Sequence, residues 1–159
     1  MKKTFAFMTA CLLLACALPC AAETRYRNGQ GRTQGTSTQN GSQTVYRDAT
    51  GRTVGTASKN GGQTVYRDGS GRMAGTVTQN GGQTIYRDAT GRTVGTATQN
   101  GSQTVYRDAT GRIVGTATPN GSQTVYRDGS GRTLGTSSTN GSNGGTATTP
   151  FFFYNNGRK

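Results

Sequence analysis

The side chains that could carry chemistry in this sequence occupy fixed places in a 20-residue phrase that occurs six times, in its regular form YRDATGRTVGTATQNGSQTV from Tyr86. Each regular copy offers one tyrosine, two arginines and one aspartate, and the sequence contains no histidine. Active sites need unlike titratable groups whose pKa values are pushed apart in a shared cleft. A ladder of identical Asp-Arg neighbours does not supply them, so we predict that the chain is not an enzyme and needs no cofactor.

The aspartate ladder is also a poor metal site. Each copy places one carboxylate, such as Asp48, beside two arginines, Arg47 and Arg52. Calcium needs more oxygen ligands and more negative charge than this arrangement provides. We therefore predict no metal site.

The arginines are a stronger indication of function, because they make the chain basic. The sequence has 18 basic and 6 acidic residues, a net charge of +12. Such a surface attracts polyanions, which release counterions when they bind. We expect an anionic glycan, lipopolysaccharide or nucleic acid as partner. Half of the arginines, Arg52 and its equivalents, would also pair with the aspartates, and the rest would help to keep an edge-rich sheet soluble. The predicted ligand-binding residues are Arg47, Arg67, Arg87, Arg107, Arg127, Tyr46, Tyr66, Tyr86, Tyr106 and Tyr126.

One copy, Gln43 to Gly62, predicts the elements that position these residues. Thr44–Arg47 is rich in strand formers. Asp48–Gly51 has the residues of a type I turn whose glycine adopts a positive φ, which gives a three-residue hairpin loop. Arg52–Ala57 is the return strand, and Asn60-Gly61 makes the next turn. The predicted structural turn residues are Asp48, Gly51, Asp68, Gly71, Asp88, Gly91, Asp108, Gly111, Asp128 and Gly131.

The repeat length raises a question of phase, because side chains alternate between the two faces of a strand. In the hairpin Tyr46 would face Val54. If Asn60-Gly61 were a strict two-residue turn in a flat meander, Tyr46 and Tyr66 would lie on opposite faces. Either the second loop has an odd length or a bulge restores the phase, and Gly55, which recurs in all six copies, is a good bulge candidate. Alternatively each copy is one coil of a solenoid. We thus expect an all-β fold of six tandem strand-turn-strand repeats, forming an elongated β-repeat sheet or a β-solenoid; both satisfy the pattern.

Two positions indicate a thin packed face in this repeat domain. Position 45 and its later equivalents are Val or Ile, and position 54 varies within a mainly apolar set. The first copy carries Gln34 at the second of these positions and resembles a polar cap.

The phrase resembles known bacterial repeats. Tyr46, Asp48, Gly51 and Arg52 match the Y-x-D-x-x-G-R core of the YD repeats in Rhs-type surface and toxin-delivery proteins, over residues 26–140, although Arg47 stands where that family often has a second aromatic residue. The resemblance implies strands and turns that wind into a sheet, not a chemistry. The spacing is also similar to choline- and glucan-binding repeats, whose paired aromatics are missing here, and to curli-type repeats.

Each copy also carries a Thr-x-Thr or Thr-x-Ser pair on its second strand, as at Thr56 and Ser58. Such arrays on flat solenoids resemble the ice-binding faces of antifreeze proteins. Threonine is equally a good exposed strand residue. Ice binding therefore stays an alternative to a purely structural role.

The N-terminus has the features of a secretory signal peptide. Lys2 and Lys3 precede an apolar run from Phe5 to Leu18 that is too short to span a bilayer, and small residues lead to Ala22. We predict cleavage before Glu23, which leaves 16 basic and 6 acidic residues, a net charge of +10. Leu13-Leu14-Ala15-Cys16 also resembles a lipoprotein cleavage box, so lipid anchoring at Cys16 is the alternative.

The chain thus divides into a signal peptide at 1–22, a six-repeat β domain at 23–140, and a Gly/Thr linker with an aromatic tail at 141–159. We expect no transmembrane segment after cleavage. The tail contains the most apolar stretch of the mature chain, which would cap the last repeat or dock as an added strand on another copy or on a secretion partner. The residues predicted for self-association are Phe151, Phe152, Phe153 and Tyr154.

Together these features predict an exported bacterial protein of the periplasm, cell surface or extracellular space. Its predicted role is structural and adhesive, as a repeat protein that self-associates in a biofilm or surface fibre. The alternative is a cell-envelope module that binds glycans or polyanions.

The leader provides the first test. We expect the exported protein to begin at Glu23, because the charge, apolar length and small residues favour cleavage there. Intact mass spectrometry of the exported chain measures this directly. A species that begins at a diacylated Cys16 would show that the lipoprotein alternative is correct.

Overall fold

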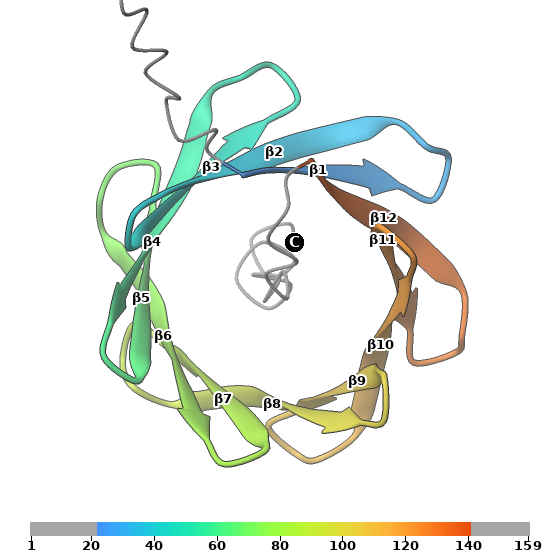
Figure 1. Cartoon of the computed structure of the whole chain (residues 1–159). Coiled ribbons are helices and arrows are strands. Elements are labelled where there is room, and N and C mark those ends of the chain that lie inside the picture. Colours follow the sequence, from blue (N-terminus) through green and yellow to red (C-terminus); the bar gives the residue numbers. More distant parts are fainter. Residues whose placement is uncertain (1–21, 141–159) are drawn as a thin grey trace, which may run out of the picture.

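The computed structural model describes residues 22–140, which form twelve antiparallel β-strands closed into a barrel (Figure 1). Each strand pairs with its neighbours in sequence, and the last pairs with the first. The strands are β1 (Glu23–Asn28), β2 (Thr33–Asn40), β3 (Gln43–Asp48), β4 (Thr53–Asn60), β5 (Gln63–Asp68), β6 (Met73–Asn80), β7 (Gln83–Asp88), β8 (Thr93–Asn100), β9 (Gln103–Asp108), β10 (Ile113–Asn120), β11 (Gln123–Asp128) and β12 (Thr133–Asn140). The leader before Ala22, with Cys16, and the tail with residues 151–154 lie outside the described residues.

The predicted all-β repeats are confirmed, but the predicted open sheet or solenoid is wrong. Twisted sheets of more than about ten strands tend to curl, and closure pairs the two edges that an open sheet would leave exposed. The closing pair repeats the internal register: Gly135 of β12 lies opposite Asn28 of β1, as Gly35 of β2 lies opposite Asp48 of β3. The first copy therefore follows the sixth as any copy follows the one before it.

The DxxG hairpins have the predicted geometry. The Gly51 N–H donates to the Asp48 carbonyl at 3.0 Å, and the Asp48 N–H donates to the Arg52 carbonyl at 2.9 Å. Gly51 has a φ of +85°, which an L side chain adopts only with strain. The three-residue loop with its glycine bulge is thus confirmed.

The second turn lies one residue later than predicted. Asn60 and Gln63 form the last strand pair, so Gly61 and Gly62 make a two-residue loop. Gly61 has a φ of +58°, and Gly62 does not have a positive φ. A positive φ at the first central residue alone is typical of a type II′ turn, which suits the Gly-Gly and Gly-Ser pairs at this place.

A β-bulge in each DxxG hairpin keeps equivalent side chains of successive copies on the same face of the sheet. Tyr46 pairs with Gly55 and Arg47 pairs with Thr53, so Val54 is the extra residue. The expectation that Tyr46 faces Val54 is wrong by one position, because the bulge precedes the glycine. With one extra residue in each copy, Tyr46 and Tyr66 both face the inside of the barrel.

The glycine beside the bulge is required by close backbone approach. At Gly115, an added Cβ would lie 2.6 Å from the carbonyl oxygen of Arg127 on the next strand. Real Cβ atoms do not approach backbone oxygen so closely, and the strand cannot shift without losing its pairing. Gly35 and Gly135 meet the carbonyl oxygens of Arg47 and Arg27 in the same way, which accounts for glycine at these places.

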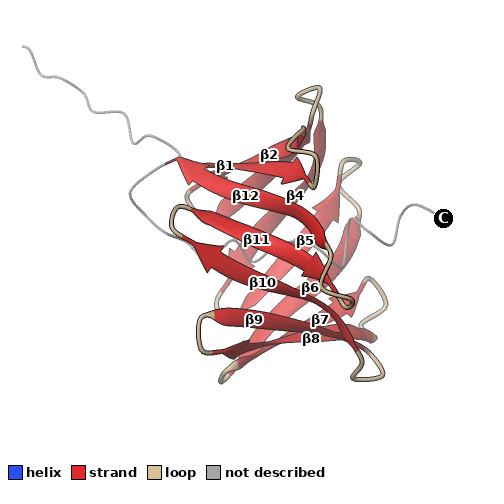
Figure 2. Ribbon diagram, turned by 90° about the vertical axis from the view of Figure 1, so that its right-hand side faces the viewer, coloured by secondary structure: helices blue, strands red, loops and turns tan. Residues whose placement is uncertain are grey.

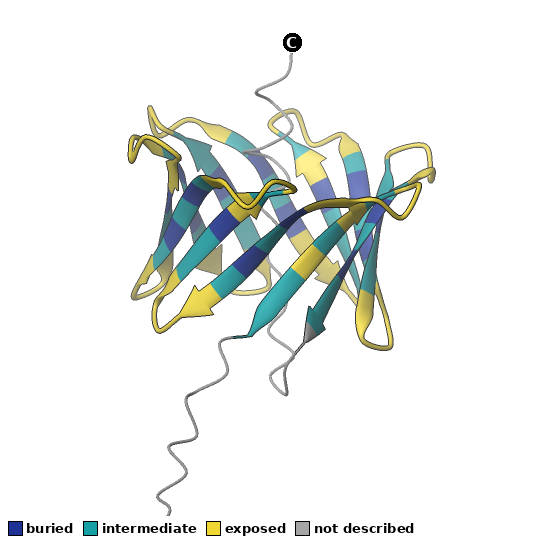
Figure 3. Ribbon diagram, turned by 90° about the horizontal axis from the view of Figure 1, so that it is seen from above, coloured by how far each residue is buried: buried dark blue, intermediate teal, exposed yellow. Residues whose placement is uncertain are grey.

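The core is a belt of tyrosines and small residues on the inner wall. Tyr86 is only 1% exposed, and Ala57, Val77 and Ala97 are buried on the intervening strands. Figure 3 shows this buried band around the middle of the barrel, with exposed residues at both ends. The residues equivalent to Val54 pack against the belt, whereas Val45 and its equivalents alternate with the tyrosines and lie half-buried on the outer wall.

The DxxG turn can be tested at a central copy. Gly91 has a φ of +85°, and the space that a Cβ would occupy there is open. Gly91→Val should therefore lower the free energy of unfolding by more than about 1 kcal/mol through backbone strain rather than a clash. Chemical denaturation measures the difference.

Thr90→Ser is the matched control, because Ser70 fills the equivalent place in another copy and makes the same hydrogen bond to its aspartate. It should change the stability little. Equal losses for the two variants would contradict the assigned turn.

Candidate functional site

The predicted arginine and tyrosine site is divided by the barrel wall. Tyr46 faces the lumen and is buried, whereas Arg47, the next residue, is exposed on the outer side. The same alternation of faces holds along β5, β7, β9 and β11, where Arg67 and Arg107 are exposed and Arg87 and Arg127 are half-buried. The arginines and tyrosines therefore belong to two separate features, an outer basic surface and an inner aromatic lining.

The turn aspartates are held by their own loops. Asp48 Oδ1 accepts hydrogen bonds from the Thr50 N–H at 2.9 Å, the Thr50 hydroxyl at 2.6 Å and the Arg52 N–H at 3.0 Å. The Thr50 hydroxyl contributes most to holding the pKa of the Asp48 carboxyl below its usual range. The same lowering of the pKa occurs at Asp68, Asp88, Asp108 and Asp128.

The predicted Asp-Arg pairing is therefore limited. Among the described residues, the one ion pair within a DxxG hairpin joins Arg132 Nε to Asp128 Oδ2 at 3.3 Å. Arg47 instead donates from Nη1 to the Thr53 hydroxyl at 3.0 Å and, more weakly, to the Gly51 carbonyl at 3.4 Å. Equivalent bonds to the loop carbonyl are made by Arg67, Arg87 and Arg107.

The barrel collects these arginines at one end. The five DxxG hairpins and the equivalent hairpin of the first copy, which has Asn28 in place of the aspartate, all join an odd-numbered strand to the next strand, so the six hairpins share one end of the wall (Figure 2). We call this end the arginine rim; its arginines are Arg27, Arg32, Arg47, Arg52, Arg67, Arg72, Arg87, Arg92, Arg107, Arg112, Arg127 and Arg132. Twelve arginines and five aspartates give it a net charge of +7. The two-residue turns at the opposite end contain only Gly and Ser.

The inner wall carries a second set of polar groups. The Tyr26 hydroxyl lies 3.1 Å from the Ser37 hydroxyl, and the Tyr126 hydroxyl lies 3.1 Å from that of Ser137. The rings of Tyr46 and Tyr66 stack with centroids 6.4 Å apart. Burial raises the pKa of Tyr26 to about 12 and also raises the pKa of Tyr66 and of Tyr86.

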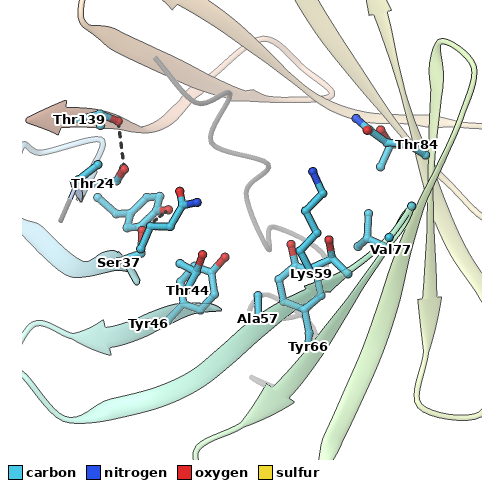
Figure 4. A pocket seen from close by; sticks show the side chains of 17 residues that line it. Thr24, Ser37, Thr44, Tyr46, Ala57, Lys59, Tyr66, Val77, Thr84 and Thr139 are labelled. Atoms are coloured by element: carbon cyan, nitrogen blue, oxygen red, sulfur yellow. Dashed lines mark hydrogen bonds between the residues drawn. The ribbon is translucent and has the colours of Figure 1, made fainter. Parts of the chain in front are cut away.

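A cavity of about 520 Å³ opens beside these tyrosines, on the lumen side of β12 and of β1 to β7 (Figure 4). Its lining is mostly hydroxyl and amide, with one cation, Lys59, which projects into the lumen. The side chains that line it include Thr24, Ser37, Gln39, Thr44, Tyr46, Lys59, Thr64, Tyr66, Gln79 and Thr84. Sequence reasoning missed this site, because it depends on barrel closure.

The threonine pairs lie on the opposite side of the wall from this cavity. Thr56 of β4 lies opposite Val45 of β3 and Arg67 of β5, with Ala57 beside it facing inward. The array therefore follows a closed, curved wall rather than a flat face. Ice binding stays a prediction that this curvature does not favour.

The sequence matches no protein-family model, no curated protein and no solved structure. The resemblance to YD repeats therefore stays a prediction. Within residues 22–140, no helix is long and apolar enough to cross a membrane. In the same part of the chain, no group of three or more His, Cys, Asp and Glu side chains could hold a metal ion.

The buried tyrosines predict an alkaline limit to stability. Unfolded tyrosine has a pKa of 10.0, and the pKa of Tyr26, Tyr66 and Tyr86 is raised in the fold. The unfolded chain therefore loses protons first, so the stability is complete below pH 10 and falls as the pH rises through the folded pKa values. A difference of one between the folded and unfolded pKa of a tyrosine corresponds to about 1.4 kcal/mol in the free energy of unfolding.

Denaturant titrations at a series of alkaline pH values measure this fall, and tyrosinate absorbance follows the ionisation. Tyr86→Phe should make the fall with pH shallower, because phenylalanine has no proton to lose. The slope with pH is compared rather than the stability itself, since the substitution also removes a buried hydroxyl. An unchanged slope would show that Tyr86 does not resist ionisation.

Proposed function

We propose that this chain is an exported bacterial adhesion protein that attaches to polyanionic polymers through the arginine rim. The observation that carries the proposal is the collection of twelve arginines on six equivalent hairpins at one end of the barrel. Anionic glycans, lipopolysaccharide and nucleic acid share the chemistry that such a rim recognises: repeated negative charges along a flexible or extended chain.

The hydrogen bonding of the loops supports this role. Each aspartate accepts hydrogen bonds from loop N–H and hydroxyl donors on its Oδ1, and among the described DxxG hairpins only Asp128 forms an ion pair with an arginine. Arg132 keeps 80% of its side chain exposed even though it forms an ion pair. The rim thus presents accessible, planar donors that suit carboxylate, sulfate and phosphate groups.

The ring also supports multivalent attachment. Six equivalent hairpins offer six weak contacts at fixed positions, and a polymer that meets one hairpin reaches the next with a high effective concentration. A single exposed arginine contact is worth little by itself. Adhesion to a repetitive polymer uses such repetition, whereas recognition of one small ligand does not.

Closure changes the expected route to a surface fibre. Among the described strands, none has an unpaired edge, so strand addition would require the barrel to open. Self-association through Phe151 to Tyr154 stays part of the proposal as a tail-mediated contact. The adhesive role of the rim does not depend on it.

The salt dependence of binding tests the rim. With single-stranded DNA as probe, the logarithm of the affinity should fall linearly with the logarithm of the salt concentration, by about 0.7 for each phosphate contact. Replacing Arg47, Arg67, Arg87, Arg107 and Arg127 with Gln one after another should flatten this slope in steps, because the copies contribute equivalent contacts. Fluorescence anisotropy measures the affinities.

Arg25→Gln is the matched control. Arg25 is also exposed but lies in the first strand, where it pairs with Glu23 at 3.5 Å, away from the DxxG loops. Its loss should leave the slope close to that of the wild type. A fixed slope in the rim variants, accompanied by unfolding, would mean that these arginines hold the hairpins and do not bind polyanions.

A further inference from the structure

The lumen cavity lies at the other end of the strands from the arginine rim. Lys59 is next to the Gly61-Gly62 turn, whereas Thr53 of the same strand is next to the DxxG loop. Six residues of extended strand span about 20 Å. A ligand in this cavity would therefore be out of reach of the rim.

Lys59 gives the cavity a feature that the repeat does not explain. Among the described residues that line the cavity, it is the only charged one. The equivalent places in the other copies hold Gln39, Gln79, Gln99, Pro119 and Thr139. Among residues 22–140, the Lys59 ammonium forms no ion pair and no hydrogen bond. It is exposed to the lumen and free to meet an anionic group there.

Hydroxyl and amide groups surround this charge in an ordered way. Thr64 lies directly opposite Lys59, and the flanking strand pairs repeat the arrangement with Gln39 opposite Thr44 and Gln79 opposite Thr84. All of these residues line the cavity. They supply donors and acceptors that can exchange hydrogen bonds with several hydroxyl groups of a ligand.

The deeper part of the cavity is aromatic. Tyr46 and Tyr66 line it together with Ala57 and Val77, and the two tyrosine rings are stacked at 6.4 Å. Aromatic rings offer a flat apolar face together with a polar hydroxyl. A sugar ring has the complementary surfaces, a face of C–H groups and an edge of hydroxyl groups. The volume of about 520 Å³ lies within the range of about 300 to 1,000 Å³ typical of small-molecule sites.

We infer that the lumen binds a saccharide with one anionic group, such as a uronic acid residue. The carboxylate would meet Lys59, the hydroxyl groups would bond to the threonine and glutamine pairs, and the ring would lie against the tyrosines. The single cation favours one anionic group over a polyanion. This inference does not rest on the proposed function, because it uses none of the rim arginines.

Tyrosine fluorescence provides the readout. The sequence has no tryptophan, so tyrosine dominates the emission. Six of its seven tyrosines lie on the odd-numbered strands and face the lumen. Titrating the mature chain with sodium galacturonate should give a saturable change in emission. Galactose has the sugar ring without the carboxylate, and acetate has the carboxylate without the ring. Both should bind at least about tenfold more weakly than galacturonate.

Lys59→Gln is the decisive variant, because Gln already occupies this place in three other copies and the barrel accepts it there. It should reduce the galacturonate affinity at least about tenfold and leave galactose binding unchanged. Restoring the charge elsewhere, in the double variant Lys59→Gln with Gln99→Lys, should not restore the affinity, since Gln99 does not line the cavity. Thr64→Val should weaken both sugars but not acetate.

Two outcomes would overturn the inference. Equal galacturonate binding by the wild type and Lys59→Gln would place the anion elsewhere, and equal binding of galacturonate and acetate would reveal a site for small anions only. Arg92→Gln separates this site from the rim: it should lower the affinity for DNA and leave galacturonate binding unchanged. A failure of the rim proposal would thus appear in the DNA titration alone.

Discussion

The whole structure depends on the extra residue that each DxxG hairpin carries. Side chains alternate along a strand, so a slip of one residue moves every side chain to the other face. The bulge at Val54 and its equivalents adds one residue to each even-numbered strand and returns each copy to the same phase. Every tyrosine of the repeat therefore faces inward, and every Arg47 equivalent faces outward. Without this insertion, alternate copies would expose their tyrosines and bury their arginines.

Closure follows from the same regularity. Because all copies have one phase and one register, the first strand can receive the last in the pairing that joins any two copies. Twelve strands make a barrel wider than the eight-stranded ones that side chains fill completely, and narrower than porins, which keep an open channel. Tyrosines that alternate with Ala, Val and Ser line the middle of the inner wall, and Thr and Gln side chains line the cavity near one end. The copy number thus determines both the core and the cavity.

The local part of this fold could be predicted, since its causes lie within a few residues. Asp48 and Gly51 define the loop by short-range hydrogen bonds and a positive φ, and these features are visible in the sequence. The sequence overstates the pairing of the Asp48 and Arg52 side chains, because the carboxylate oxygen is already held by backbone N–H groups. The position of the bulge could not be predicted, because the sequence favours Gly55 for it, whereas pairing with the neighbouring strand leaves Val54 as the extra residue. Closure joins residues far apart in the chain, such as Thr24 and Thr139, whose hydroxyl groups lie 3.0 Å apart.

The asymmetry of the repeat gives the barrel two different ends. Each copy places most of its charged residues directly beside the three-residue loop and its smallest residues in the two-residue turn, and antiparallel closure brings all loops of one kind to the same end. The arginine rim is therefore a consequence of topology acting on a repeated sequence: no single copy is strongly basic, but six copies in a ring are. In the lumen, by contrast, a difference between copies matters. Lys59 replaces the uncharged residue of the other copies, and this one substitution gives one side of a symmetric wall its own chemistry. Repetition suits contacts with polymers, and the exceptions to repetition are where a site for a single small molecule can arise.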